Sequence, residues 1–117
     1  LIPILLTISG CSLSTYDKAV VASNEVRTIA EAQQSLISSY CVPKYQAAQT
    51  QQDISDADKV CLPAKTSFYA VKAAWISLSA ILEAAKYNQA SEQEIQKAEL
   101  NLFSALTNLN KSIQELK

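Results

Sequence analysis

The sequence predicts an all-α protein, an up-down-up bundle of three helices with a disulfide-pinned connection between the first two. The chain has 117 residues and one glycine, Gly10, so residues 11–117 contain no glycine at all. Pro43 and Pro63 are the only prolines in that body, which is instead rich in Ala, Gln, Leu and Lys. Three stretches repeat apolar residues in steps of three and four, as amphipathic helices do. The length suits one domain with a modest core.

The first helix is expected from about Thr15 to Tyr40. Its apolar stripe is Ala-rich and weaker than the other two, and it contains one polar member, Gln33. That glutamine either sets the register of the bundle or lies at the edge of the contact, and we favour the edge. The stripe consists of Ala19, Ala22, Val26, Ile29, Gln33, Leu36 and Tyr40.

Residues 42–62 are expected to connect the first helix to the second, with two or so helical turns after Pro43. Asp53, Asp56 and Asp58 lie close together in this connection. A calcium loop would need a glycine for its tight turn and a terminal glutamate, and the segment has neither at the required place. We therefore interpret the three aspartates as solvated residues near helix starts.

The second helix is expected to begin near Pro63, because proline suits the first turn of a helix. Its stripe consists of Phe68, Val71, Trp75, Leu78, Leu82 and Ala85. Ile76 and Ile81 lie off that line and indicate contacts on two sides of the helix. The following link, residues 87–90, is short, so the second and third helices should be antiparallel neighbours.

The third helix opens with a capping box in which Ser91 and Glu94 satisfy each other's backbone N–H groups. Leu106 and Ile113 widen its apolar face, and Ser112 is the single polar member. The stripe consists of Ile95, Ala98, Leu102, Ala105, Leu109, Ser112 and Leu116. Heptad-like spacing in all three helices favours shallow crossing angles.

The segment before the bundle is apolar from Leu1 to Ile8 and carries no charge. It is too short to span a bilayer as a helix and has the length of a signal-peptide core. The four residues that end it, Ile8-Ser9-Gly10-Cys11, resemble the bacterial lipobox. The resemblance implies a diacylglycerol on the Cys11 thiol, cleavage between Gly10 and Cys11, and an amino group on Cys11 open to acylation.

The resemblance divides the chain into a signal peptide over 1–10, a lipidated tether over 11–14 and the helical domain over 15–117. The positively charged segment that usually precedes the apolar core is absent from this sequence. The alternative is a buried strand or helix end that finishes in Ser-Gly-Cys. As a lipoprotein, the protein would face the periplasm at the cell envelope. Ser12 after the acceptor would favour the outer membrane in a Gram-negative host.

The cysteine count agrees with a lipid on Cys11. The chain has three cysteines, so lipidation of one leaves Cys41 and Cys61 as a pair. Both are followed by an aliphatic residue and a proline, and an oxidising compartment allows them to form a disulfide. Two free buried thiols are the alternative. A structural zinc site lacks ligands, because the chain has no histidine.

Composition excludes several classes of function. Lys plus Arg number 10 against 11 acidic residues, without a basic cluster, which argues against nucleic acid as a partner. The lack of histidine removes the usual nucleophile–base pairs, and the lack of glycine removes phosphate loops. We therefore expect no enzyme, no metal and no cofactor beyond the lipid. The aromatic residues are interpreted as core and rim, although they could line a ligand groove: Tyr16, Tyr40, Tyr45, Tyr69, Tyr87 and Trp75.

Two classes of function follow from these observations. The first is a membrane-anchored bundle with a structural or protein-interaction role, which includes phage or prophage accessory lipoproteins for exclusion or lysis. The second is a small-molecule or lipid-binding module with an enclosed cavity, although the Ala-rich stripes favour a filled core. Self-association that completes the weak first helix is a third possibility.

Overall fold

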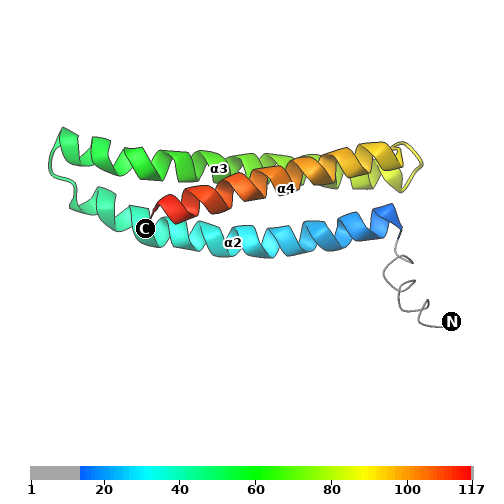
Figure 1. Cartoon of the computed structure of the whole chain (residues 1–117), viewed down its shortest axis with the longest axis horizontal. Helices are drawn as coiled ribbons and strands as arrows, with labels where there is room; N and C mark the ends of the chain where they lie inside the picture. Colours follow the sequence, from blue (N-terminus) through cyan, green and yellow to red (C-terminus); the bar gives the residue numbers. More distant parts are fainter. Residues whose placement is uncertain (1–13, 117) are drawn as a thin grey trace.

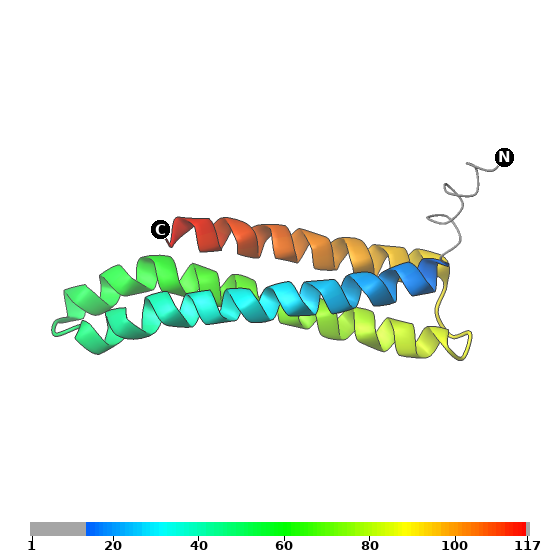
Figure 2. The same cartoon turned by 90° about the horizontal axis from the view of Figure 1, so that it is seen from below.

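The protein is a bundle of three long helices, seen here in a computed structural model that describes residues 14–116. The helices are α2 (Thr15–Ala47), α3 (Gln51–Ala85) and α4 (Glu92–Glu115). They run up, down and up along one axis, and each contacts both of the others (Figures 1 and 2). The described residues contain no strand. The predicted all-α, up-down-up, three-helix bundle is confirmed.

The first helix starts at Thr15 as predicted, but its predicted C-terminal end and the predicted start of the second helix are wrong. α2 continues through Pro43 to Ala47, and α3 starts at Gln51, so Pro63 lies inside a helix and not in its first turn. The connection is only residues 48–50. Each proline removes one backbone hydrogen bond, which is a local cost that the neighbouring turns and side-chain packing can outweigh. A proline within a helix-favouring sequence is therefore a weak stop signal in this chain.

The start of α3 is fixed by a capping box that includes one of the three clustered aspartates. The Asp53 N–H donates to Thr50 Oγ1 at 3.0 Å, and the Thr50 N–H donates to Asp53 Oδ2 at 3.2 Å. The Gln49 N–H donates to the same carboxylate oxygen at 3.0 Å. The Gln49 N–H, followed by the Thr50 groups, holds the pKa of Asp53 below its ordinary value. The Asp53 carboxylate therefore accepts hydrogen bonds from the backbone of the α2–α3 connection and completes the N-terminal cap of α3.

The turn between α3 and α4 contains the single non-glycine residue with positive φ in the described chain, Asn88 at 58°. The Gln89 N–H donates to Ala84 O at 2.9 Å, and the Asn88 N–H donates to Ala85 O at 3.1 Å. This is the Schellman pattern, which closes a helix with one left-handed residue. Asparagine tolerates that conformation better than most residues, which explains how a body without glycine makes this turn.

Asn88 gives a test of this turn. Asn88→Ala should lower the free energy of unfolding by about 1 kcal/mol, because alanine pays more to adopt a left-handed conformation. Asn88→Gly should preserve or raise stability, since glycine adopts that conformation freely. Chemical denaturation followed by circular dichroism measures both. Equal destabilisation by alanine and glycine would show that the asparagine side chain, not the backbone conformation, matters.

The core is one continuous cluster along the bundle axis, and α4 supplies its most regular part. Leu78 of α3 and Leu102 and Leu109 of α4 are fully buried. The polar member of the α4 stripe, Ser112, is also buried, and its Oγ lies 2.9 Å from Ser67 Oγ on α3. The predicted α4 stripe is buried from Ile95 to Leu116, with Ala105 half-buried.

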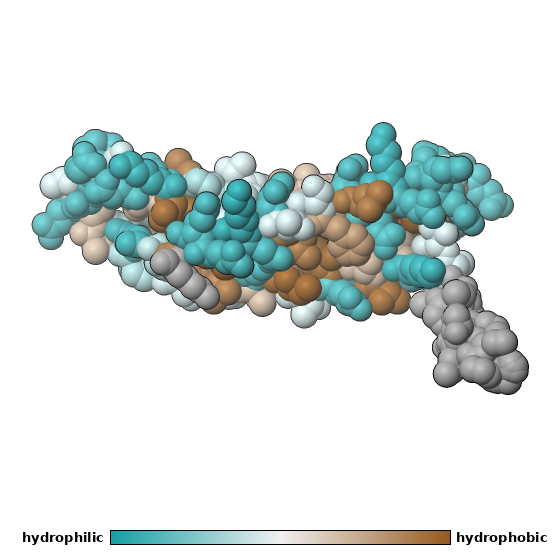
Figure 3. Space-filling model, viewed as in Figure 1, coloured by the Kyte–Doolittle hydropathy of each residue, from teal (hydrophilic) through white to brown (hydrophobic). Residues whose placement is uncertain are grey.

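The predicted stripe of α2 is only partly correct. Ile29 and Leu36 are 41% and 50% exposed, whereas Ala30 and Ile37 are buried in their place. The buried face rotates because α2 must contact α3 as well as α4, and it is tied to α3 at Cys41. Figure 3 shows apolar residues gathered in the middle of one broad face, where α2 and α4 meet.

Gln33 connects α2 to α4 through a hydrogen bond from its Nε2 to Asn110 Oδ1. The residue is half-buried, at the edge of the contact between the two helices.

The α2–α3 hairpin extends past the C-terminal end of α4 (Figures 1 and 2). That projecting hairpin contains few buried side chains, so the burial of apolar side chains contributes little to its stability.

Candidate functional site

A disulfide joins α2 to α3, the two helices of the projecting hairpin. Cys41 and Cys61 are bonded, with their Cα atoms 6.0 Å apart, and they are 5% and 0% exposed. The predicted bond is thus confirmed, although it bridges two continuous helices and not the base of an irregular loop. The bond encloses residues 42–60, which include the three-residue connection, and holds the two helices in register.

The disulfide lies at the point where both helices lack a backbone hydrogen bond. A helical N–H at residue 43 would bond the carbonyl of Ser39, and one at residue 63 would bond the carbonyl of Lys59. Pro43 and Pro63 have no N–H to donate. Cys41 lies between the first pair and Cys61 between the second, so the covalent bond reinforces the weakest section of the hairpin.

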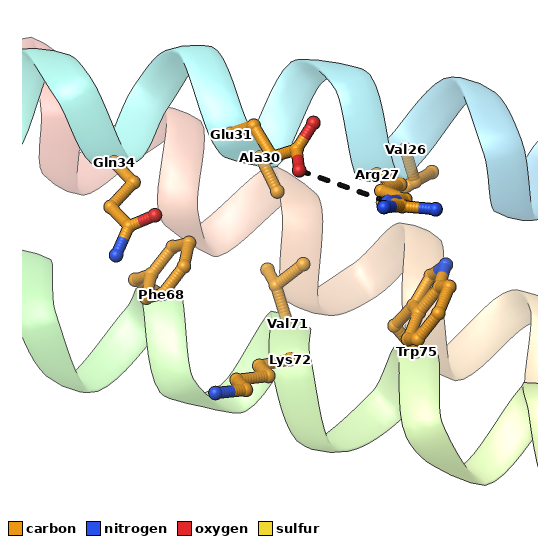
Figure 4. Close-up of a pocket in the computed structure, with 9 residues that line it drawn as sticks. All are labelled: Val26, Arg27, Ala30, Glu31, Gln34, Phe68, Val71, Lys72 and Trp75. Atoms are coloured by element: carbon orange, nitrogen blue, oxygen red, sulfur yellow. Dashed lines mark ion pairs between the residues drawn. The ribbon is translucent and has the colours of Figure 1, made fainter.

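A groove runs between α2 and α3, with α4 behind it (Figure 4). Its volume is about 230 Å³. Side chains from the two helices face each other across it, apolar at the bottom and charged at the rim. The lining residues are Val26, Arg27, Ala30, Glu31, Gln34, Phe68, Val71, Lys72 and Trp75.

Trp75 is fixed in this groove by a hydrogen bond from its Nε1–H to the backbone carbonyl of Ser23, 3.1 Å away. On the rim, Arg27 Nε and Glu31 Oε2 are 3.7 Å apart and exposed, so that ion pair adds little stability. Lys72 completes the charged rim. The groove is open to solvent, which suits side chains of another protein better than an enclosed small molecule.

A second hollow of about 240 Å³ continues toward the disulfide, and Gln34 and Phe68 border both hollows. Tyr45 and Tyr69 line this second part. The Tyr45 hydroxyl donates to Asp58, which raises the pKa of Tyr45 above its ordinary value. Among the predicted core and rim aromatic residues, Trp75, Tyr45 and Tyr69 thus share one face.

The other aromatic residues lie apart from this face. The Tyr40 ring lies under Lys44, whose Nζ is 4.9 Å from the ring centroid. Tyr87 is 67% exposed in the turn after α3. Tyr16 lies near the start of α2, beside a shallow hollow that Ala85 and Ile95 also line. Tyr16 and Tyr40 are half-buried against the core and fit the interpretation of core and rim, whereas the exposed Tyr87 does not.

The clustered aspartates have separate structural partners. Asp53 caps α3, Asp58 accepts from Tyr45, and Asp56 Oδ1 is 3.7 Å from Lys59 Nζ. Within residues 14–116, no group of three or more His, Cys, Asp or Glu side chains is placed to hold a metal ion. The residues of the lipobox, including Gly10 and Cys11, lie outside the described residues.

α3 is long and apolar enough to cross a membrane by length and composition alone. Only 17% of its most apolar window is buried within the bundle. It nevertheless contacts both α2 and α4. α3 therefore carries more apolar residues than its packing against α2 and α4 within one chain buries.

Comparisons with protein-family models, curated proteins and solved structures gave no match to this chain.

Proposed function

We propose that this protein is an exported lipoprotein, a non-enzymatic helical bundle that is held at the cell envelope by lipid on Cys11 and contacts other proteins there. The observation that carries the proposal is the order of residues in the N-terminal segment. An apolar, uncharged run ends in Ile8-Ser9-Gly10-Cys11, and the chain turns polar immediately afterwards. Two acyl chains on one thiol would give lasting attachment to a bilayer.

The disulfide supports export. Disulfides persist in oxidising compartments, including the bacterial periplasm, and are rare where thiols are kept reduced. Cys41 and Cys61 bond each other, so neither is available to Cys11. A lipid on the third cysteine accounts for an odd number of thiols in an exported protein.

The surface of the bundle supports a protein-interaction role. The groove between α2 and α3 is open, and its rim carries Arg27, Glu31 and Lys72 around an apolar base. An apolar centre with a polar rim is the usual composition of protein interfaces. The rigid Trp75 is the type of residue that contributes strongly to such contacts.

Cys11→Ser tests the anchoring. We expect the wild-type chain, expressed in a bacterial host, to start at Cys11, to carry the added mass of the lipid and to fractionate with membranes. The Cys11→Ser chain should lose the added mass and the cleavage. Intact-mass spectrometry of the purified chain measures both.

Ser12→Ala is the matched control, because it changes the neighbouring residue and leaves the acceptor thiol. It should keep the lipid mass and the membrane location. An unchanged mass and an unchanged fractionation in Cys11→Ser would refute the lipoprotein proposal. A retained uncleaved segment in the wild type would refute the predicted cleavage between Gly10 and Cys11.

A further inference from the structure

α3 carries a second apolar seam on the face that points away from the core. The residues follow steps of four and three, the spacing of a coiled-coil contact. All of them are exposed in the bundle. This outer seam consists of Leu62, Thr66, Tyr69, Ala73, Ile76 and Ala80.

The outer seam alternates large and small residues. Leu62, Tyr69 and Ile76 are large and are 49%, 58% and 54% exposed. Thr66, Ala73 and Ala80, which alternate with them, are small. The seam is about 27 Å long at the rise of an α-helix. A row of large exposed apolar side chains with small residues between them is a pattern of knobs and holes without a partner.

The outer seam is also uncharged. Lys65 and Lys72 border it on the side of the α2–α3 groove, and no seam position is Asp, Glu, Lys or Arg. A depletion of charge is typical of the centre of a protein interface. It also explains why α3 meets the length and composition of a membrane span while it packs in a bundle.

We propose that the outer seam binds the outer seam of a second copy of this chain, with the two α3 helices antiparallel. In that orientation one register places every large residue against a small one. Tyr69 then lies opposite Ala73 of the second copy. The other pairs are Leu62 with Ala80 and Thr66 with Ile76.

The self-complementary order of residues favours a second copy over any other partner. A twofold axis between Tyr69 and Ala73 generates all the pairs at once, as an isologous interface requires. An uncharged seam also meets its own copy without an unpaired charge at the centre. A lipid surface, in contrast, has no fixed holes that would match an alternation of large and small side chains.

The available area fits a specific dimer of modest affinity. Covering the three large residues removes about 300 Å² of apolar surface per copy from water. The small residues and the borders of the helix bring the total for two copies to about 1,000 Å², the size of a weak interface. The dimer does not depend on the lipid, so its test and that of Cys11 can fail independently.

Cysteine cross-linking, wherever the chain fractionates, tests the register. Two differently tagged full-length chains, one with Thr66→Cys and one with Ile76→Cys, are expressed together and treated with an oxidant. A disulfide needs Cα atoms within about 7 Å, so the antiparallel register predicts a mixed dimer. Chains that pair Leu100→Cys with Ile76→Cys are the matched control, since Leu100 is exposed on α4, and should not cross-link.

Substitutions at the middle of the seam test complementarity. Tyr69→Lys should lower the mixed dimer at least about tenfold, whereas Leu100→Lys, which puts the same charge on α4, should leave it unchanged. Ala73→Tyr should also lower it, because two large residues then meet. Combining Tyr69→Ala with Ala73→Tyr restores the match of large to small and should restore the cross-link. Circular dichroism verifies that each variant keeps its helices.

Three results would overturn the proposal. One is the absence of the mixed dimer in chains that fold. Another is a cross-link that survives Tyr69→Lys or falls equally with Leu100→Lys. The third is a monomeric Cys11→Ser chain that binds vesicles of phosphatidylglycerol and phosphatidylethanolamine through Tyr69, which would assign the seam to a membrane surface.

Discussion

Loss of the Cys41–Cys61 bond should lower the free energy of unfolding by about 3 kcal/mol, because the bond closes a short loop in the unfolded chain. In a domain of this size the melting temperature would fall by roughly 12–20 °C. The effect should be strongest beyond the bond. Ala57 is one of the few buried side chains there, and Pro43 and Pro63, each two residues after a bonded cysteine, each remove a helical hydrogen bond.

Two samples separate the contributions of the bond. The reduced wild-type chain keeps both sulfur atoms in the core and loses only the covalent link. The chain with Cys41→Ala and Cys61→Ala loses the link and part of the packing, so it should be the less stable of the two. Hydrogen exchange at residues 42–60 should accelerate in both more than at residues 92–115. A melting temperature within about 2 °C of the oxidised protein would contradict the expected role.

The fold class and the up-down-up order of the helices could be predicted from the sequence because the signals for them are local and repeated. The capping box at Ser91 and Glu94 is present, with the Glu94 N–H donating to Ser91 Oγ at 3.1 Å. The regular stripe of α4 faces the core as spacing predicts. Such signals are independent of distant parts of the chain, so one sequence suffices to recognise them.

Helix ends and the face of α2 depended on tertiary contacts that the sequence does not display. Pro43 and Pro63 predict helix boundaries, yet the helices continue because the flanking turns pack and the disulfide holds them together. The buried face of α2 is set by two neighbouring helices at once. The spacing of its apolar residues alone therefore predicts burial of Ile29 and Leu36, which are exposed. A propensity scale contains neither effect.

The candidate surfaces were visible in the sequence only as anomalies. Ile76 lay off the expected line of the second helix, and this indicated a second contact side that the chain itself does not cover. The groove at Trp75 was not predictable, because it arises from the relative position of α2 and α3. Its one anchoring hydrogen bond joins Trp75 to Ser23, residues far apart in the sequence.

Leu102→Ala should give the largest loss of stability among single core substitutions, about 3–4 kcal/mol. Leu102 is fully buried at the middle of α4, between Ala98 and Leu109 on the same face. Removing its side chain costs the transfer energy of the lost atoms and leaves a cavity that a long, rigid bundle fills poorly. Urea denaturation of the oxidised chain, with the transition midpoint and slope fitted together, measures the loss.

Leu100→Ala makes this prediction specific to the buried face. Leu100 lies two residues earlier on the same helix and is 68% exposed. Both substitutions place alanine, the best helix former, at the same type of position, so helix propensity cancels in the comparison. Leu100→Ala should change stability by less than about 0.5 kcal/mol. Similar losses from the two variants would mean that α4 presents a different face to α2 and α3, and the packing described for the whole bundle would then be wrong.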